Sequence, residues 1–583
     1  MRVLLLHPDD SPRRGPWTRQ RWDLVIDLGA SSLFSEHSWM QQYGCPVWRA
    51  QSFRRGIADV KEVRKIFSAG RHRMVDEEGI DWWDFMSLLV APEALTALAL
   101  SRIAAEISPA AELWATRPSW PANLLGVLLQ RPIRSFGQNP VARATAFAAH
   151  YAGLAQRFSA SQIKEIFFDK YDPGYRWRSR VASKPEKCAS PVVLVPSAYG
   201  NVSSTAAAYA RLLPEQSFLL VATRRSAKRF VPPPNVRVRD LAVYARGETP
   251  TDEIAFLAER WKQIAEDLDS VPELRVLMQV GVMDPFPAWL HDGLCTRDAW
   301  RTAIEREPVC GLLCGDDSNL YTRLPVALAA RRKIPTVDFH HGALDGRYLL
   351  KDLPCDVYLA KSEMERDYLL RICNLPEERV VLGPPLPSHT GARMHNTAER
   401  NSAIFFSEPF ESAGIRTEEI YREILPAVVQ VARKHGRRLI LKLHPFESLS
   451  QRRRILRDVL TPEDRTQVTV VDGPLTDDLM AQAWFGITVE SSTVVECQQR
   501  GIACFLCGWL KFSPYEYVQQ FARFGIGKIL QSAEQILEIP TLLEKSQNRE
   551  ELPPTESTPA DPAMLQQWLT DGLRYPSGVR SAS

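Results

Sequence analysis

Short apolar runs alternate with longer stretches of helical periodicity along most of the chain. Residues 437–445, RRLILKLHP, are typical of a buried strand, whereas residues 417–436, TEEIYREILPAVVQVARKHG, repeat their apolar positions at the spacing of an amphipathic helix. Strands that alternate with such helices are typical of a parallel sheet that is covered by helices on both faces. The pattern therefore predicts an α/β protein with doubly wound sheets.

The pattern is clearest over residues 400–545, where we predict one Rossmann-like domain. Thr417 is expected to cap its first long helix, Gly436 to end that helix, and Thr476 to cap a shorter one. The other strands are expected in SAIFFSEP (402–409), QVTVVDG (467–473), FGITVE (485–490) and IACFLCG (502–508).

At 583 residues the chain is too long for a single hydrophobic core, and further domains are expected before this one. Residues 186–390 are predicted to form a second Rossmann-like domain. Residues 1–185 are predicted to begin with two strands, MRVLLLHP and WDLVIDLG, and to continue as a mostly helical region. Residues 546–583 are expected to be a Pro-rich linker and a short last helix. The strands of the middle domain are expected in PVVLVPSAYG, SFLLVATRR, RVLMQVG (275–281), VCGLLCGDD, IPTVDFHHG and CDVYLAKS.

The charge balance argues against a protein that binds nucleic acid through a basic surface. The 72 basic residues nearly balance the 69 acidic ones, which leaves a net charge of +3. Of the ten cysteines only Cys504 and Cys507 have the C-x-x-C spacing, and no second pair completes a zinc site. The cysteines are expected to be reduced thiols in a cytoplasmic protein. The first apolar run lacks the basic region and the cleavage site of a signal peptide.

The most apolar window, residues 85–107, contains Pro92, Glu93 and Arg102. These interruptions favour one or two core helices over a membrane-spanning helix. Contact with a membrane is therefore expected to be peripheral at most, at its cytoplasmic face.

Polar residues follow two strands of the predicted C-terminal domain. His444 and Pro445 end one strand, and Glu490, Ser491, Ser492 and Thr493 lead from another strand directly into a helix. Ligands of open α/β sheets bind at the carboxyl ends of the strands, so these residues are candidates for an anion site. The alternatives are a partly buried histidine and ordinary helix caps, which need no ligand.

The arrangement KLHPFE (442–447) followed by TVESSTVVE (488–496) resembles the C-terminal domain of bacterial GT-B glycosyltransferases that use CMP-activated sugars, such as capsule polysialyltransferases and Kdo transferases. CDP-glycerol glycerophosphotransferases look similar over the same stretch. The resemblance covers residues 310–510 approximately. It implies a GT-B fold, with two Rossmann-like domains that face each other across a cleft.

The resemblance also implies roles for individual residues. It makes His444, Pro445, Ser491, Ser492 and Thr493 contacts to the donor nucleotide and its phosphates, with Glu447 in the same site and Glu490 as a ribose contact. Pro445 would hold His444 at the strand end, where its imidazole could stabilise charge on the leaving group, so His444 is also a catalytic candidate.

An inverting glycosyl transfer needs a base on the acceptor side. Asp316 and Asp317 follow one strand of the middle domain, and His340 and His341 follow the next. The sialyltransferase families have an acidic pair followed by glycine as their base motif, whereas Ser318 follows the pair here. The alternative for the pair is a capped helix start with Arg323 as its ion-pair partner.

A metal site is not expected, because the Asp-x-Asp triplet at residues 267–269 ends a helical pattern instead of a strand. The sequence thus predicts a cytoplasmic, metal-independent glycosyltransferase of polysaccharide or capsule biosynthesis without a cofactor. Its partners would be a nucleotide-sugar donor and a surface glycan or glycolipid acceptor. Transfer of polyol phosphate from a CDP-alcohol, epimerisation of a UDP-sugar and non-catalytic nucleotide binding remain alternatives.

Overall fold

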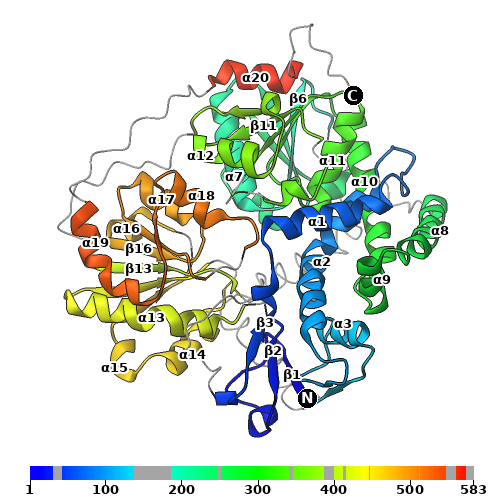
Figure 1. Cartoon of the computed structure of the whole chain (residues 1–583). Coiled ribbons are helices and arrows are strands. Elements are labelled where there is room, and N and C mark those ends of the chain that lie inside the picture. Colours follow the sequence, from blue (N-terminus) through cyan, green and yellow to red (C-terminus); the bar gives the residue numbers. More distant parts are fainter. Residues whose placement is uncertain are drawn as a thin grey trace.

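The computed structural model contains three parallel α/β sheets, one after another along the chain. The residues that it describes are 1–29, 42–136, 186–245, 251–340, 344, 346–352, 354–386, 400–410, 415–444, 447–473, 475–510, 513–546 and 560–572. Figure 1 shows the first sheet below the other two, with the middle domain above it and the C-terminal domain to one side.

The first sheet has five strands in the order β3-β2-β1-β4-β5, all parallel. The two strands predicted from the sequence are the central strand β1 and its neighbour β2, and the other three have only three or four residues each. Its strands are β1 (Arg2–Leu6), β2 (Leu24–Asp27), β3 (Val47–Arg49), β4 (Glu112–Ala115) and β5 (Ile133–Ser135), and its helices are α1 (Ile57–Phe67), α2 (Trp82–Glu106) and α3 (Trp120–Leu129).

Helix α2 contains the apolar window that the sequence singled out. It runs through Pro92 for 25 residues, and by length and composition alone it could cross a membrane. Trp82 and Trp83 at its start and Leu100 and Ile103 near its end are buried in the main hydrophobic core. Both ends of this helix are therefore buried inside the protein, as predicted for a core helix.

The middle domain is built on a seven-stranded sheet in the order β12-β11-β10-β9-β6-β7-β8. The chain starts at β6 in the interior, moves to one edge and then crosses to β9, so the strand order reverses between β6 and β9. Its strands are β6 (Val192–Ser197), β7 (Ser217–Ala222), β8 (Val236–Asp240), β9 (Val309–Cys314), β10 (Thr336–Phe339), β11 (Val357–Ala360) and β12 (Val380–Leu382).

One predicted strand of this domain is wrong. The run RVLMQVG lies mainly in helix α9 (Pro272–Gln279), whose buried residues Leu274 and Leu277 are three positions apart. Pro272 occupies the first turn, where a helix tolerates its missing N–H. The other helices of the domain are α7 (Gly200–Leu212), α8 (Thr251–Leu268), α10 (Phe286–Arg306), α11 (Leu320–Arg331) and α12 (Glu363–Asp367).

The C-terminal domain has a six-stranded parallel sheet in the order β15-β14-β13-β16-β17-β18, which reverses between β13 and β16. Its strands are β13 (Ser402–Phe406), β14 (Arg438–Lys442), β15 (Val468–Val471), β16 (Ala483–Thr488), β17 (Cys504–Cys507) and β18 (Lys528–Leu530). Its helices are α13 (Thr417–Lys434), α14 (Leu449–Val459), α15 (Pro462–Arg465), α16 (Asp477–Ala481), α17 (Thr493–Gln499), α18 (Tyr517–Arg523) and α19 (Ile539–Ser546).

Two of the three predicted helix signals of this domain are confirmed. Thr476 accepts a hydrogen bond from the Leu479 N–H as the cap of α16, and Gly436 follows α13 with a φ of 65°. Thr417, however, is already inside α13, and Arg416 occupies the capping position without a side-chain hydrogen bond. The long helix therefore begins one residue earlier than predicted, and its start is held by tertiary contacts.

The last helix returns to the middle domain. Helix α20 (Pro562–Asp571) packs over β9 and β10 and buries Leu565, Trp568 and Leu569 there; Figure 1 shows it above that sheet. Gly311 in β9 allows the close approach, because a Cβ at this position would lie 1.8 Å from the Leu569 carbonyl oxygen.

The middle and C-terminal domains are joined by the segment that contains α18. Tyr368 donates a hydrogen bond to the Tyr515 carbonyl (2.8 Å), and Arg523 forms an ion pair with Asp367 at 2.6 Å. The predicted fold class is confirmed: two Rossmann-like doubly wound domains, the GT-B plan, are preceded by an extra N-terminal α/β region.

Candidate functional site

The candidate residues of the C-terminal domain lie where the strand order reverses. Strands β13 and β16 are neighbours there, and Glu408 and Glu490 follow their carboxyl ends. His444 follows β14, on the other side of β13. In doubly wound sheets this position is where the loops diverge and a ligand can enter.

His444 is half-buried at the end of β14, and its backbone N–H donates to Glu447 Oε2 at 2.6 Å. Burial, followed by the nearby Lys442 ammonium, lowers the pKa of His444 below 6.5. The imidazole is therefore neutral near pH 7, where one ring nitrogen can still donate a hydrogen bond. Pro445 lies outside the described residues.

Glu447 holds this loop from within. Its carboxylate is almost fully buried and accepts hydrogen bonds from Ser407 (2.8 Å) and Arg452 (2.7 Å), besides that from the His444 N–H. Burial raises the pKa of Glu447, and the Arg452 guanidinium opposes this shift. With these contacts Glu447 fixes the position of His444, which is a structural role beside its predicted role as a nucleotide contact.

Glu490, Ser491 and Ser492 form the loop after β16, and Thr493 begins α17; all four residues are partly buried. Ser491 Oγ accepts a hydrogen bond from the Thr493 N–H at 3.3 Å, whereas the Ser492 side chain makes no capping hydrogen bond. Helix α17 has only seven residues. The capping interpretation therefore applies to Ser491, and a phosphate contact from this loop stays a prediction.

Glu408 is a residue of this site that the sequence analysis missed. Its Oε1 accepts a hydrogen bond from the Glu490 N–H at 2.9 Å and lies 3.0 Å from the Thr488 hydroxyl, so it links the ends of β13 and β16. Its place directly after SAIFFS could have marked it, since it follows a strand as His444 does. An acidic residue after one strand is too common a signal by itself.

In the middle domain Asp316 and Asp317 follow β9, beside the reversal between β6 and β9. Asp317 is buried and forms an ion pair with Lys351, which is fully buried. The Lys351 ammonium also lies 2.7 Å from Ser318 Oγ and 4.0 Å from the centre of the Tyr348 ring. The Asp317 carboxylate is thus paired with the Lys351 ammonium inside the domain.

The capped-helix alternative for the acidic pair is wrong. Asn319 caps α11, accepting a hydrogen bond from the Tyr321 N–H at 3.0 Å. Arg323 pairs with Asp84 of α2 instead of the acidic pair. His340 follows β10 and is partly buried, and His341 lies outside the described residues.

Within the described parts of the chain, no group of three His, Cys, Asp or Glu side chains could hold a metal ion. In the Asp-x-Asp triplet, Asp267 forms an ion pair with Arg73 and Leu268 is buried at the end of α8. Asp267 and Asp269 thus lie at the end of a helix, as predicted.

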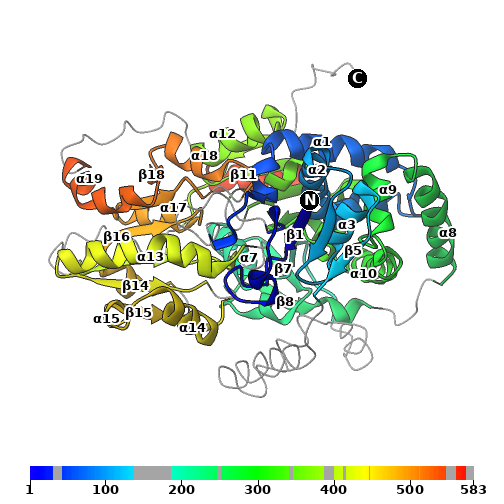
Figure 2. The same cartoon turned by 60° about the horizontal axis from the view of Figure 1, so that its bottom comes forward.

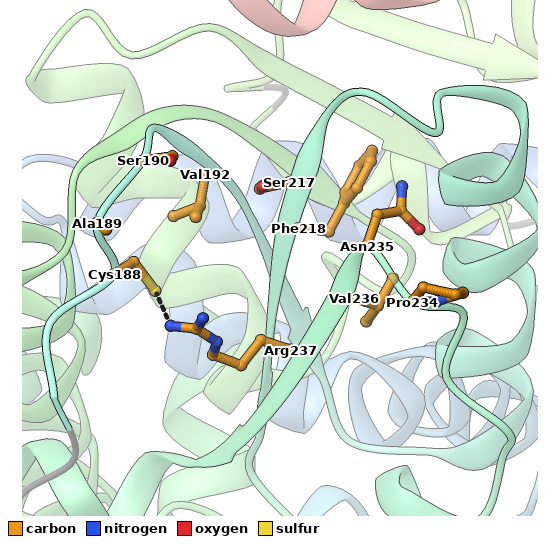
Figure 3. Close-up of a pocket in the computed structure, with 10 residues that line it drawn as sticks. All are labelled: Cys188, Ala189, Ser190, Val192, Ser217, Phe218, Pro234, Asn235, Val236 and Arg237. Carbon is orange, nitrogen blue, oxygen red and sulfur yellow. Dashed lines mark hydrogen bonds between the residues drawn. The ribbon is translucent and has the colours of Figure 1, made fainter.

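A cavity of about 320 Å³ opens at the amino ends of β6, β7 and β8 (Figure 3). Cys188, Ser190, Asn235 and Arg237 are among its lining residues, and Arg237 donates to Cys188 Sγ at 3.4 Å. The cavity lies at the edge of the sheet opposite to Asp316 and Asp317, because all strands of this sheet are parallel. It contains none of the candidate residues.

No protein-family profile matches the chain, and no curated protein matches it in sequence. Among solved structures it is similar to UDP-GlcNAc 2-epimerase from Neisseria meningitidis bound to UDP-GlcNAc, at 12% identity and a TM-score of 0.39 over 61% of this chain and 92% of that one. It is also similar to UDP-GlcNAc 2-epimerase from Methanocaldococcus jannaschii, at 10% identity and a TM-score of 0.38 over 65% of this chain and 99% of that one.

A glycosyltransferase from Rickettsia africae gives 10% identity and a TM-score of 0.36 over 62% of this chain and 90% of that one. At TM-scores this low, such likenesses carry no conclusion about activity, which has to rest on the residues of the chain itself.

Proposed function

We propose that the protein transfers a sugar from a nucleotide-activated donor, preferably a CMP-sugar, to a surface glycan or glycolipid acceptor. The observation that carries the proposal is the convergence of His444, Glu490 and Ser491 at the strand-order reversal of the C-terminal sheet, tied together through Glu447 and Glu408. Ligands of doubly wound sheets bind where the strand order reverses.

In the proposed reaction the C-terminal domain holds the donor and the middle domain takes the proton of the acceptor hydroxyl. The neutral His444 imidazole would donate a hydrogen bond to a donor phosphate oxygen as negative charge grows on the leaving group. A carboxylate of the middle domain would act as the base in an inverting transfer without a metal ion. The reaction would take place in the cytoplasm, at the inner face of the membrane if the acceptor is a glycolipid.

A panel of nucleotides tests the proposal on the full-length protein. Calorimetry with CMP, CDP and UDP should show binding, with CMP preferred. Tighter binding of UDP would favour the epimerase alternative, since the solved structures of two similar epimerases carry UDP-GlcNAc or UDP. A preference for CDP would favour transfer from a CDP-alcohol, and absence of binding to all three would contradict a nucleotide-dependent enzyme.

His444→Ala is expected to lower kcat by roughly 10²-fold, because it removes a contact to the charge that develops in the transition state. Donor turnover in a transfer assay measures this effect. His435→Ala is the matched control, since His435 is exposed at the end of α13 in the same domain. Equal activity of folded His444→Ala and His435→Ala would show that His444 has only a structural role.

Replacing both Ser491 and Ser492 with alanine should weaken nucleotide binding by about 1–3 kcal/mol if their hydroxyls contact phosphate. Thr461→Ala is the control, because Thr461 caps α15 through the Asp464 N–H at 3.1 Å. The control should lower only the melting temperature. If the double variant behaves in the same way, with normal nucleotide affinity in calorimetry, its serines act only as helix caps.

A further inference from the structure

Glu408 connects the two strands between which the order of the C-terminal sheet reverses. It lies two residues after β13, and its carboxylate faces the backbone N–H of Glu490 at 2.9 Å and the Thr488 hydroxyl at 3.0 Å. The Val489 N–H also points at this carboxylate. One side chain thus engages the three consecutive residues with which β16 ends and its loop begins.

The surroundings of Glu408 are acidic. Glu447 acts on it from the loop before α14, Glu490 lies in its field from the loop after β16, and the Cys507 thiol lies in its field from the end of β17. The positive charges of Lys442 and Arg452 interact with Glu447. Glu408 therefore has two carboxylates near it, and its hydrogen-bond donors are a hydroxyl and backbone amides.

We propose that Glu408 is a positioning residue for the donor site: through Thr488 and the Glu490 N–H it sets the path of the loop that carries Ser491, Ser492 and Thr493. The proposal deepens the proposed function and rests on it for the identity of the ligand. The other contacts of this loop are the hydrogen bond from the Ser513 N–H to the Glu490 carboxylate and that from the Thr493 N–H to Ser491 Oγ; α17 is short, and Ser492 does not cap it. Without Glu408 the Glu490 N–H would lose its acceptor after β13, whereas the Thr488 hydroxyl would keep its hydrogen bond to the Phe406 carbonyl.

The charge on Glu408 is also expected to make nucleotide affinity depend on pH. Burial raises the pKa of Glu408 to about 7, and the hydrogen bonds from Glu490, Thr488 and Val489 only partly oppose this shift. A nucleotide phosphate in the adjacent loop favours the neutral form of the carboxyl group, because an ionised one repels it. Nucleotide affinity should thus be highest below pH 7 and should fall as the pH rises through that value.

Two variants separate the geometric role from the charge. Glu408→Ala removes the acceptor, whereas Glu408→Gln retains an oxygen for the Glu490 N–H and removes the charge. Glu419→Gln is the matched control, because burial also raises the pKa of Glu419 to about 7, but this residue lies on α13 beside Arg13 and Arg416.

The geometric role is measured by hydrogen–deuterium exchange of the full-length protein in a peptide that covers residues 486–495. Glu408→Ala should increase exchange in this peptide by about tenfold, because the loop of the variant can open without breaking the hydrogen bond to Glu408. Glu408→Gln and Glu419→Gln should leave exchange unchanged. Unchanged exchange in Glu408→Ala would overturn the proposal, whichever nucleotide the protein binds.

The ligand side is measured as the Kd of CMP, CDP and UDP between pH 6 and pH 8.5. Glu408→Ala should weaken binding on the order of tenfold. Glu408→Gln should reduce the pH dependence that the wild type and Glu419→Gln show, and the part that remains is expected from Glu490, whose pKa burial also raises. A pH dependence of the same size in Glu408→Gln and the wild type would refute the electrostatic part.

Increased exchange in Glu408→Ala, in a protein whose wild type binds none of the three nucleotides, would support the positioning role. That result would at the same time reject the proposed function, so the two ideas can fail separately.

Discussion

Asp316→Asn is expected to lower kcat for glycosyl transfer by about 10²–10⁴-fold and to leave donor binding unchanged. Asp316 or Asp317 was predicted as the base, and the two side chains have different surroundings in the structure. Asp317 is 2% exposed and paired with Lys351, whereas Asp316 is the more exposed of the two at 9%. A base must reach the acceptor hydroxyl, so we expect Asp316 to take the proton.

The comparison with Asp317→Asn decides between the two aspartates. That variant leaves the buried Lys351 ammonium without its carboxylate, and it should lose stability as well as activity. A folded Asp316→Asn variant with full activity would remove Asp316 from the mechanism. His340→Ala and His341→Ala test the competing bases, and EDTA is expected to leave transfer unaffected.

Arg416→Ala is expected to destabilise the protein by about 3–5 kcal/mol, because it leaves a buried carboxylate without its partner. The Arg416 side chain is 6% exposed and forms an ion pair at 2.7 Å with Asp27, which is completely buried at the end of β2. Its guanidinium also donates to the carbonyl oxygens of His7 (2.9 Å) and Asp10 (3.2 Å). Arg416 thus joins the C-terminal domain to the first sheet. Figure 2 shows α13, which starts directly after Arg416, beside the blue N-terminal segment.

Denaturant unfolding monitored by hydrogen exchange in both domains measures this effect. Arg14→Ala is the control at the same joint, because Arg14 is 75% exposed and lies 3.9 Å from Asp458, and such surface pairs contribute little. The double variant Arg416→Met with Asp27→Leu should recover part of the loss, since it removes the buried Asp27 carboxylate together with its partner, and the buried Arg49 keeps Glu419 and Glu423 nearby. A single variant as stable as the control would contradict the expectation.

The sequence was sufficient for the elements whose apolar runs are long. The central strands β6, β13, β14 and β16 lie where continuous hydrophobic runs predicted them, and Gly436 ends its helix as expected. The same pattern placed His444 and Glu490 at strand ends, which topology then brings to one edge of a sheet. Patterning succeeds here because these strands are buried on both faces.

The sequence failed where local pattern is ambiguous or where the contact is distant. The run RVLMQVG is short and apolar, so periodicity could not distinguish strand from helix. The partners Glu408 and Glu490, Asp317 and Lys351, or Arg416 and Asp27 are far apart in the chain. Only the folded structure shows that Lys351 pairs with Asp317 and that Glu408 accepts a hydrogen bond from the Glu490 N–H.

The return of α20 to the middle domain makes the order of synthesis matter. The surface on β9 and β10 that receives Leu565, Trp568 and Leu569 is made long before these residues leave the ribosome, because the whole C-terminal domain is translated in between. At about 5–20 residues per second, this delay is on the order of 10–40 s. During that time the apolar face on β9 and β10 is uncovered in the nascent middle domain, which is completed only after α20 has been made.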